Sequence, residues 1–182
     1  MKAQILQSNA KYGAKVAALL LHLSKIPAEA LNRQPAKGGW SAAQTAWHLI
    51  KVEELSLEYV QKKLGFGGSF EKVGPGVHWR SFLLKAALWL PIKFKAPVTS
   101  GDNLQSQSTF AEINAHWNKT REAWTDFLAQ MPEALEDKAV YKHPSAGRLG
   151  WIQMLAFFEE HFDRHWWQIE RALLPLPPQQ RN

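Results

Sequence analysis

The chain has 182 residues, a length that fits one domain, and its 46% hydrophobic content is high enough to form a core. It has no cysteine, which excludes disulfides, cysteine-ligated metal sites and a cysteine nucleophile. The 22 Lys and Arg residues exceed the 16 Asp and Glu residues. The formal net charge of +6 permits contact with phosphates or anionic lipids but does not demonstrate it. No stretch reaches the roughly 20 apolar residues that span a bilayer.

The first predicted helix runs from about residue 3 to residue 24 and ends before Pro27. Its seam residues recur at alternating intervals of three and four, a spacing typical of a helix in a bundle. They are Ile5, Asn9, Tyr12, Val16, Leu19, Leu23 and Ile26. The lysines before the apolar run imitate the start of a signal peptide, but the charged region is too long and His22 interrupts the run. We therefore expect a mature cytoplasmic protein.

Three more amphipathic helices follow along the chain. The second opens at Ser41, which forms a capping-box pattern with Gln44, and it continues to about Lys63. The third runs from about Ser108 to Met131, and the fourth starts near Gly150 and ends before the prolines of the tail. Four such helices predict an all-α fold, a four-helix bundle. No alternating pattern is strong enough to predict a strand.

Residues 66–104 form a connection between the second and third helices that is too long for a plain loop. This insertion contains a predicted short helix from Trp79 to Leu90. The stretch from Trp79 to Lys95 is apolar with basic flanks. It could be a lid over a metal site, a dimer surface or a peripheral membrane contact. We expect residues 1–182 to be a single domain with this insertion and a short Pro-rich tail at residues 175–182.

Basic and aromatic residues together also suggest binding of single-stranded nucleic acid. The sequence contains no recognised nucleic-acid-binding motif, however. We therefore expect no nucleic-acid partner.

The most informative residues are histidines. His161 and His165 share one helix face at spacing i, i+4, so both imidazoles can reach one metal ion. They lie on the apolar seam of the fourth helix, where unpaired imidazoles would cost free energy. His48, two turns into the second helix, is the natural third ligand. The HExxH pattern of zincin peptidases would need Glu at the position of Phe162, so that class is not expected.

Five further residues are candidates for the pocket or for orienting the ligands. Gln44 lies one turn before the histidine of the second helix and could face the open coordination side. Glu160 could accept a hydrogen bond from an imidazole N–H. His143 could line the mouth of the site, and Arg164, like Arg148, could hold an anionic substrate.

Two segments resemble a known family. The segment from Trp40 to Leu49, WSAAQTAWHL, resembles the opening of the second helix in DinB-like proteins, the YfiT-type metalloenzyme family. The segment from His143 to Gly150, HPSAGRLG, followed by His161 and His165, resembles the closing motif of that family. The resemblance covers essentially the whole chain, and the three histidines are its most specific part.

The resemblance implies an up-down-down-up four-helix bundle that is often a homodimer. It implies a divalent metal, commonly zinc or nickel, held by His48, His161 and His165. Relatives include S-transferases that use bacillithiol and the mycothiol-dependent maleylpyruvate isomerase. We therefore expect a metal-dependent transferase that activates a low-molecular-weight thiol against a small-molecule substrate. The alternatives are a metal-dependent hydrolase that uses a metal-bound water, and a non-catalytic binding module with structural histidines.

Overall fold

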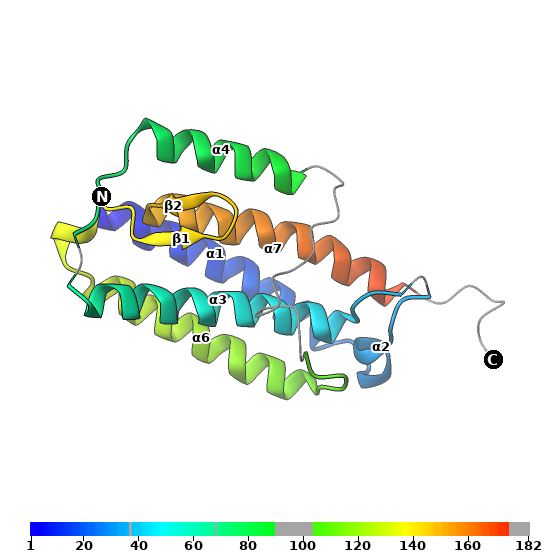
Figure 1. Cartoon of the computed structure of the whole chain (residues 1–182). Helices are drawn as coiled ribbons and strands as arrows, with labels where there is room; N and C mark the ends of the chain where they lie inside the picture. Colours follow the sequence, from blue (N-terminus) through cyan, green and yellow to red (C-terminus); the bar gives the residue numbers. More distant parts are fainter. Residues whose placement is uncertain (37, 68, 90–103, 175–182) are drawn as a thin grey trace.

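A computed structural model of the protein describes residues 1–36, 38–67, 69–89 and 104–174. Within these ranges four long helices form the bundle: α1 (Lys2–Leu23), α3 (Ala42–Gly65), α6 (Phe110–Gln130) and α7 (Trp151–Leu173). Helices α1 and α7 run in one direction and α3 and α6 in the other (Figure 1). Both α1 and α3 pack against α6 and α7. The predicted all-α, up-down-down-up bundle is confirmed.

The starts of two bundle helices follow directly from local sequence. At the start of α3, the Ser41 hydroxyl accepts from the Gln44 backbone N–H, and the Gln44 side-chain oxygen accepts from the Ser41 N–H, both over 3.1 Å. Thr109 and Glu112 form the same reciprocal pair at the start of α6. Each capping box satisfies N–H groups that the first helical turn leaves without a partner. The cap of α3 also fixes where the second-turn residue His48 lies.

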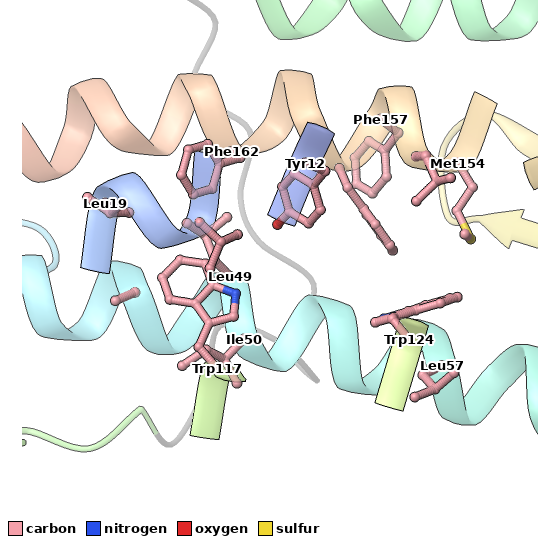
Figure 2. Packing of buried hydrophobic residues seen from close by; sticks show 14 of the residues in the cluster. Tyr12, Leu19, Leu49, Ile50, Leu57, Trp117, Trp124, Met154, Phe157 and Phe162 are labelled. Carbon is pink, nitrogen blue, oxygen red and sulfur yellow. The ribbon is translucent and has the colours of Figure 1, made fainter. Parts of the chain in front are cut away.

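Aromatic side chains fill the space between the four helices (Figure 2). Trp117 and Trp124 of α6 are fully buried. The Tyr12 ring of α1 meets the Phe162 ring of α7 edge-on, with centroids 5.7 Å apart and an interplanar angle of 88°. Such edge-to-face contacts add to the free energy gained by burying apolar area. This core holds α7 in a fixed position against both α1 and α3.

The structure contains short elements that the sequence did not predict. A helix α2 (Ala28–Asn32) lies between α1 and α3, and a single 3-10 turn, η1 (Glu133–Leu135), follows α6. Strands β1 (Tyr141–His143) and β2 (Gly147–Leu149) pair in an antiparallel hairpin just before α7. The expectation of no strand was therefore wrong. Strands of three residues are too short to show an alternating pattern.

The insertion contains helix α4 (Pro75–Trp89), which lies against α7 and the hairpin (Figure 1). A short helix was expected here, but it begins four residues earlier, at a proline that suits the first helical position. Its inner face buries Val77, whereas Trp79 and Phe82 are 61% and 60% exposed. The rest of the apolar stretch, residues 90–103, and the Pro-rich tail at 175–182 lie outside the described residues. Among the helices that are described, none is apolar over a length sufficient to cross a bilayer.

Candidate metal centre

Three histidines from two bundle helices converge on one point. His48 comes from the second turn of α3, and His161 and His165 come from adjacent turns of α7. The Nε2 atom of His161 lies 3.4 Å from that of His48 and 3.1 Å from that of His165. One nitrogen from each ring lies within 4.8 Å of the other two. His48 thus presents a ring nitrogen to the same point as two histidines that lie more than 110 positions further along the chain.

These distances suit a metal ion. Zinc bound to imidazole nitrogens at about 2.0–2.1 Å in a tetrahedral arrangement separates those nitrogens by about 3.3–3.4 Å. The three rings are inclined to one another by 61° to 78°, so they meet at their edges and do not stack. In the part of the chain that the structure describes, the cluster consists of histidines alone, and neutral imidazoles do not reduce the charge of a bound divalent cation. Three protein ligands also leave part of the coordination sphere free.

A hydrogen bond selects which nitrogen of His165 faces the cluster. The Nδ1 atom of His165 lies 3.0 Å from the side-chain oxygen of Gln168, one turn further along α7. An amide oxygen can only accept, so Nδ1 carries the hydrogen and Nε2 keeps its lone pair. That lone pair points toward His161. Gln168 therefore prepares His165 as a ligand.

The surroundings keep the α7 histidines neutral. Burial, followed by the neighbouring His165 and His48 rings, lowers the pKa of His161 well below its usual value. Burial and then His48 lower the pKa of His165 to about 3, although its bond to Gln168 acts in the opposite direction. Neutral imidazole is the form that binds metals. Near pH 7 both rings are therefore ready to act as ligands.

Aromatic side chains form the walls of the centre. The Trp40 ring lies 4.8 Å from the His48 ring and 6.5 Å from the His165 ring, measured between centroids. On another side, Phe157 stacks on His161 at 5.3 Å. These ring contacts restrict the orientations of the imidazoles. No sequence pattern indicated this role for Trp40, which precedes α3 and comes near the histidines only through the fold.

Two of the candidate pocket residues have other partners. The side-chain oxygen of Gln44 is part of the α3 capping box. The Glu160 carboxylate forms an ion pair with Lys85 of α4. In the described part of the chain, the hydrogen bonds and ion pairs found for Glu160 do not include a histidine. Its position instead helps to join α4 to α7.

His143 and Arg164 are also absent from the three-histidine cluster. His143 accepts hydrogen bonds at Nδ1 from the backbone N–H groups of Ser145 and Ala146, over 3.2 and 3.1 Å, and so closes the hairpin turn. Its ring packs edge-on against Phe157 at 4.5 Å, and burial lowers its pKa to about 4. Arg164 donates from Nη1 to the backbone oxygen of Leu88 over 2.7 Å. It therefore holds the end of α4 over α7.

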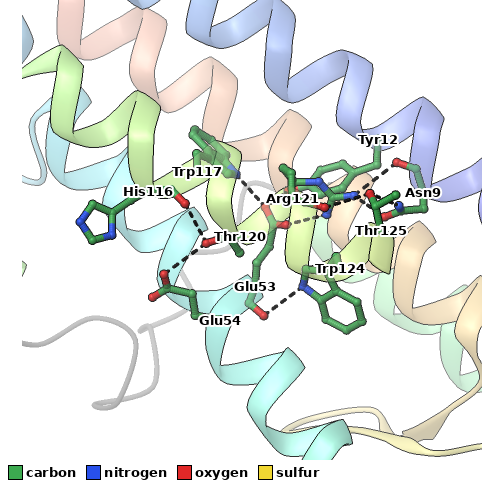
Figure 3. Close-up of polar contacts among 10 residues, drawn as sticks. All are labelled: Asn9, Tyr12, Glu53, Glu54, His116, Trp117, Thr120, Arg121, Trp124 and Thr125. Atoms are coloured by element: carbon green, nitrogen blue, oxygen red, sulfur yellow. Dashed lines mark hydrogen bonds and ion pairs between the residues drawn. The ribbon is translucent and has the colours of Figure 1, made fainter. Parts of the chain in front are cut away.

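A buried polar network fixes α3, five residues beyond His48 (Figure 3). The Glu53 carboxylate is 1% exposed and accepts from the Tyr12 hydroxyl, the Trp117 indole N–H and the Arg121 guanidinium at 2.7–2.8 Å. Burial, then Glu53, raises the pKa of Tyr12 well above its usual value, so its hydroxyl stays a donor. The network joins α1, α3 and α6 through one side chain. Sequence reasoning missed it, since Glu53 and Arg121 are distant in the chain.

The comparison with protein families agrees with the fold and the histidine cluster. A sequence model of the DinB superfamily matches residues 14–169, which is most of the chain. The chain therefore belongs to the DinB superfamily, as the resemblance indicated. No curated protein and no solved structure gave a significant match. Membership of this superfamily and the three-histidine cluster are both compatible with metal binding.

Proposed function

We propose that His48, His161 and His165 hold one divalent metal ion, zinc or nickel, and that the protein is a metal-dependent transferase acting with a low-molecular-weight thiol. The observation that carries this proposal is the convergence of three imidazole nitrogens from α3 and α7 on one point. When bound, such a cation supplies Lewis acidity and favours the thiolate form of a small thiol, which is the reactive form.

The residues of the chain have distinct parts in this proposal. The three histidines bind the cation in their neutral forms, and Gln168 orients His165 through its Nδ1–H. Trp40 and Phe157 pack against the imidazoles of His48 and His161, respectively. Because the chain has no cysteine, the thiol has to come from a cosubstrate. The similarity of the histidine motif to thiol-dependent relatives in the superfamily supports this choice over hydrolysis.

Conjugation assays test the transferase proposal. Zinc- or nickel-loaded protein is incubated with a low-molecular-weight thiol, such as cysteine or a bacillithiol analogue, and a panel of small electrophiles. We expect thiol consumption above the uncatalysed rate, lost in His161→Ala and kept in His22→Ala, which changes a half-exposed histidine of α1. Turnover of ester substrates without any thiol would favour a hydrolase. Metal-loaded protein that is inactive in both assays would support the non-catalytic alternative.

A further inference from the structure

Two arginines meet where α4 lies against the hairpin. Arg80 of α4 donates from Nη2 to the backbone oxygen of Arg148 in β2 over 3.1 Å. The Arg80 side chain also lies close to Gly147, since a Cβ added to Gly147 would be 3.7 Å from Nε of Arg80. Lys142 is directly opposite Arg148 in the hairpin register. The fold thus gathers three cationic residues around one short strand.

Both arginines have donors without acceptors. Nε of Arg80 and Nη1 of Arg148 are buried and have no hydrogen-bond partner within the described ranges. A guanidinium N–H removed from water without an acceptor costs free energy, and like charges on directly opposite strand positions repel each other. None of the ion pairs found in the described residues involves Arg80, Arg148 or Lys142. An anion beside Arg148 would offset the repulsion between these positive charges.

A cavity adjoins this cluster. It has a volume of about 320 Å³ and is lined by Ser69, Phe70, Glu71 and Arg148. This volume is large enough for a carboxylate or phosphate group together with part of the molecule that carries it. Glu71 is exposed and forms no ion pair with Arg148 in the part of the chain that the structure describes. The Arg148 guanidinium is therefore not neutralised by the one acid in the lining.

We propose that this cavity is a binding subsite for the anionic group of a small molecule, a carboxylate or a phosphate. Arg148 lines the cavity and is the main contact, because a guanidinium pairs with either group through two parallel hydrogen bonds. Arg80 and Lys142 add positive charge beside it. None of the three clustered histidines lines this cavity, and Arg148 occupies the hairpin face opposite to that of His143. The inference does not depend on the proposed transferase activity.

Titrations of the intact protein with sodium phosphate and, separately, sodium acetate at constant ionic strength test the subsite. The readout is the set of backbone and arginine side-chain N–H signals in NMR spectra. We expect a saturable shift centred on β2 and the Arg80 side chain, and the stronger of the two probes identifies the preferred group. Arg148→Gln should weaken binding about tenfold. Glu71→Gln should strengthen it by removing a like charge.

The control variant is Lys119→Gln, which lowers the net charge equally at an exposed position on α6. It should bind like the wild type. The absence of any saturable shift with either anion would overturn the proposal. So would equal affinity in Arg148→Gln and the wild type, since the anion would then bind elsewhere. If Arg148→Gln fails to fold, Arg148→Lys replaces it, since lysine keeps the charge without the paired donors. Unchanged anion affinity in Arg148→Lys, together with unchanged affinity in Glu71→Gln, would also overturn the proposal.

Discussion

At the residue scale, Gln168 shows how one hydrogen bond can orient an imidazole of the proposed metal centre. Its amide oxygen is 3.0 Å from Nδ1 of His165, and this contact leaves Nε2 free to face His161 and His48. A residue of this kind orients a ligand without touching the metal. If the cluster binds a metal as proposed, removal of Gln168 is expected to weaken that binding without abolishing it.

We expect Gln168→Ala to lower zinc affinity by about 10–100-fold, the range found for partners that orient metal-binding histidines. Competition titration with a chromophoric zinc chelator measures the change. Gln130→Ala, at the exposed end of α6, is the matched control and should bind zinc like the wild type. An unchanged affinity in Gln168→Ala would show that His165 needs no such orientation.

The buried histidines also predict how the stability of the metal-free protein depends on pH. Burial lowers the pKa of His165 to about 3 and that of His143 to about 4, whereas both titrate near 6.5 in the unfolded chain. Below pH 6.5 the unfolded state therefore binds more protons than the folded state, and stability decreases as the pH falls toward these lowered values. Above pH 6.5 this contribution is fully present.

Urea unfolding of metal-free protein at pH 7.5 and pH 5 checks this expectation. We expect a loss of roughly 1–4 kcal/mol at pH 5, because each histidine contributes up to about 2 kcal/mol over the 1.5 pH units below 6.5. His143→Gln should lose less than the wild type over the same interval. Equal stability at the two pH values would contradict the assignment of neutral, buried imidazoles.

At the scale of the elements, Glu53 joins three helices through one carboxylate (Figure 3). Glu53→Gln leaves the Arg121 guanidinium buried without its partner charge, and Arg121 is 8% exposed. We expect a loss of about 3–5 kcal/mol in the free energy of unfolding, the usual cost of breaking a buried pair from one side. Glu54→Gln is the neighbouring control, since Glu54 is half-buried and accepts one bond, from Thr120. A loss of similar size in both variants would contradict a special role for Glu53.

The start of α7 depends on close packing at Gly150. A Cβ at this position would lie 2.4 Å from Cγ2 of Val73 and 2.7 Å from the side-chain oxygen of Gln153. Gly150→Ala should therefore destabilise the protein by about 1–3 kcal/mol. Gly13→Ala, inside α1 with no atom within 4 Å of the new Cβ, should instead stabilise it by about 0.5–1 kcal/mol. Thermal unfolding measures both variants, and a stabilised Gly150→Ala would refute the close contact.

At the scale of the whole molecule, the sequence predicted those features that repeat with the period of a helix. The four bundle helices could be foreseen from this period, as could the positions of His48, His161 and His165 on inward faces, whereas the direction of each helix was implied only by the family resemblance. The capping residues Ser41 and Gln44 marked the start of α3 in advance. Each of these signals lies within a single helix or in its first turn, so it can be read without knowing the fold.

Features that depend on which segments meet in space could not be predicted in the same way. The hairpin of β1 and β2 has strands of three residues, which show no periodicity. The ion pair between Glu53 and Arg121 and the contact of Trp40 with two histidines join positions that no local pattern connects. Such contacts depend on how the packed helices are positioned along and around one another, and the hydrophobic pattern of each helix does not determine that position.

The most direct test of the metal centre is to count metal ions per chain by elemental mass spectrometry. Untagged wild-type protein, His48→Ala and His116→Ala are each incubated with zinc and then desalted; His116 is exposed on α6 and serves as the control. We predict about one zinc ion per chain in the wild type and in His116→Ala, and a higher melting temperature for these two proteins with zinc than without it. His48→Ala should lose most of the zinc. Two results would contradict a site shared by α3 and α7. One is wild-type protein that retains no zinc and whose melting temperature does not change on incubation with zinc. The other is full retention of zinc by His48→Ala.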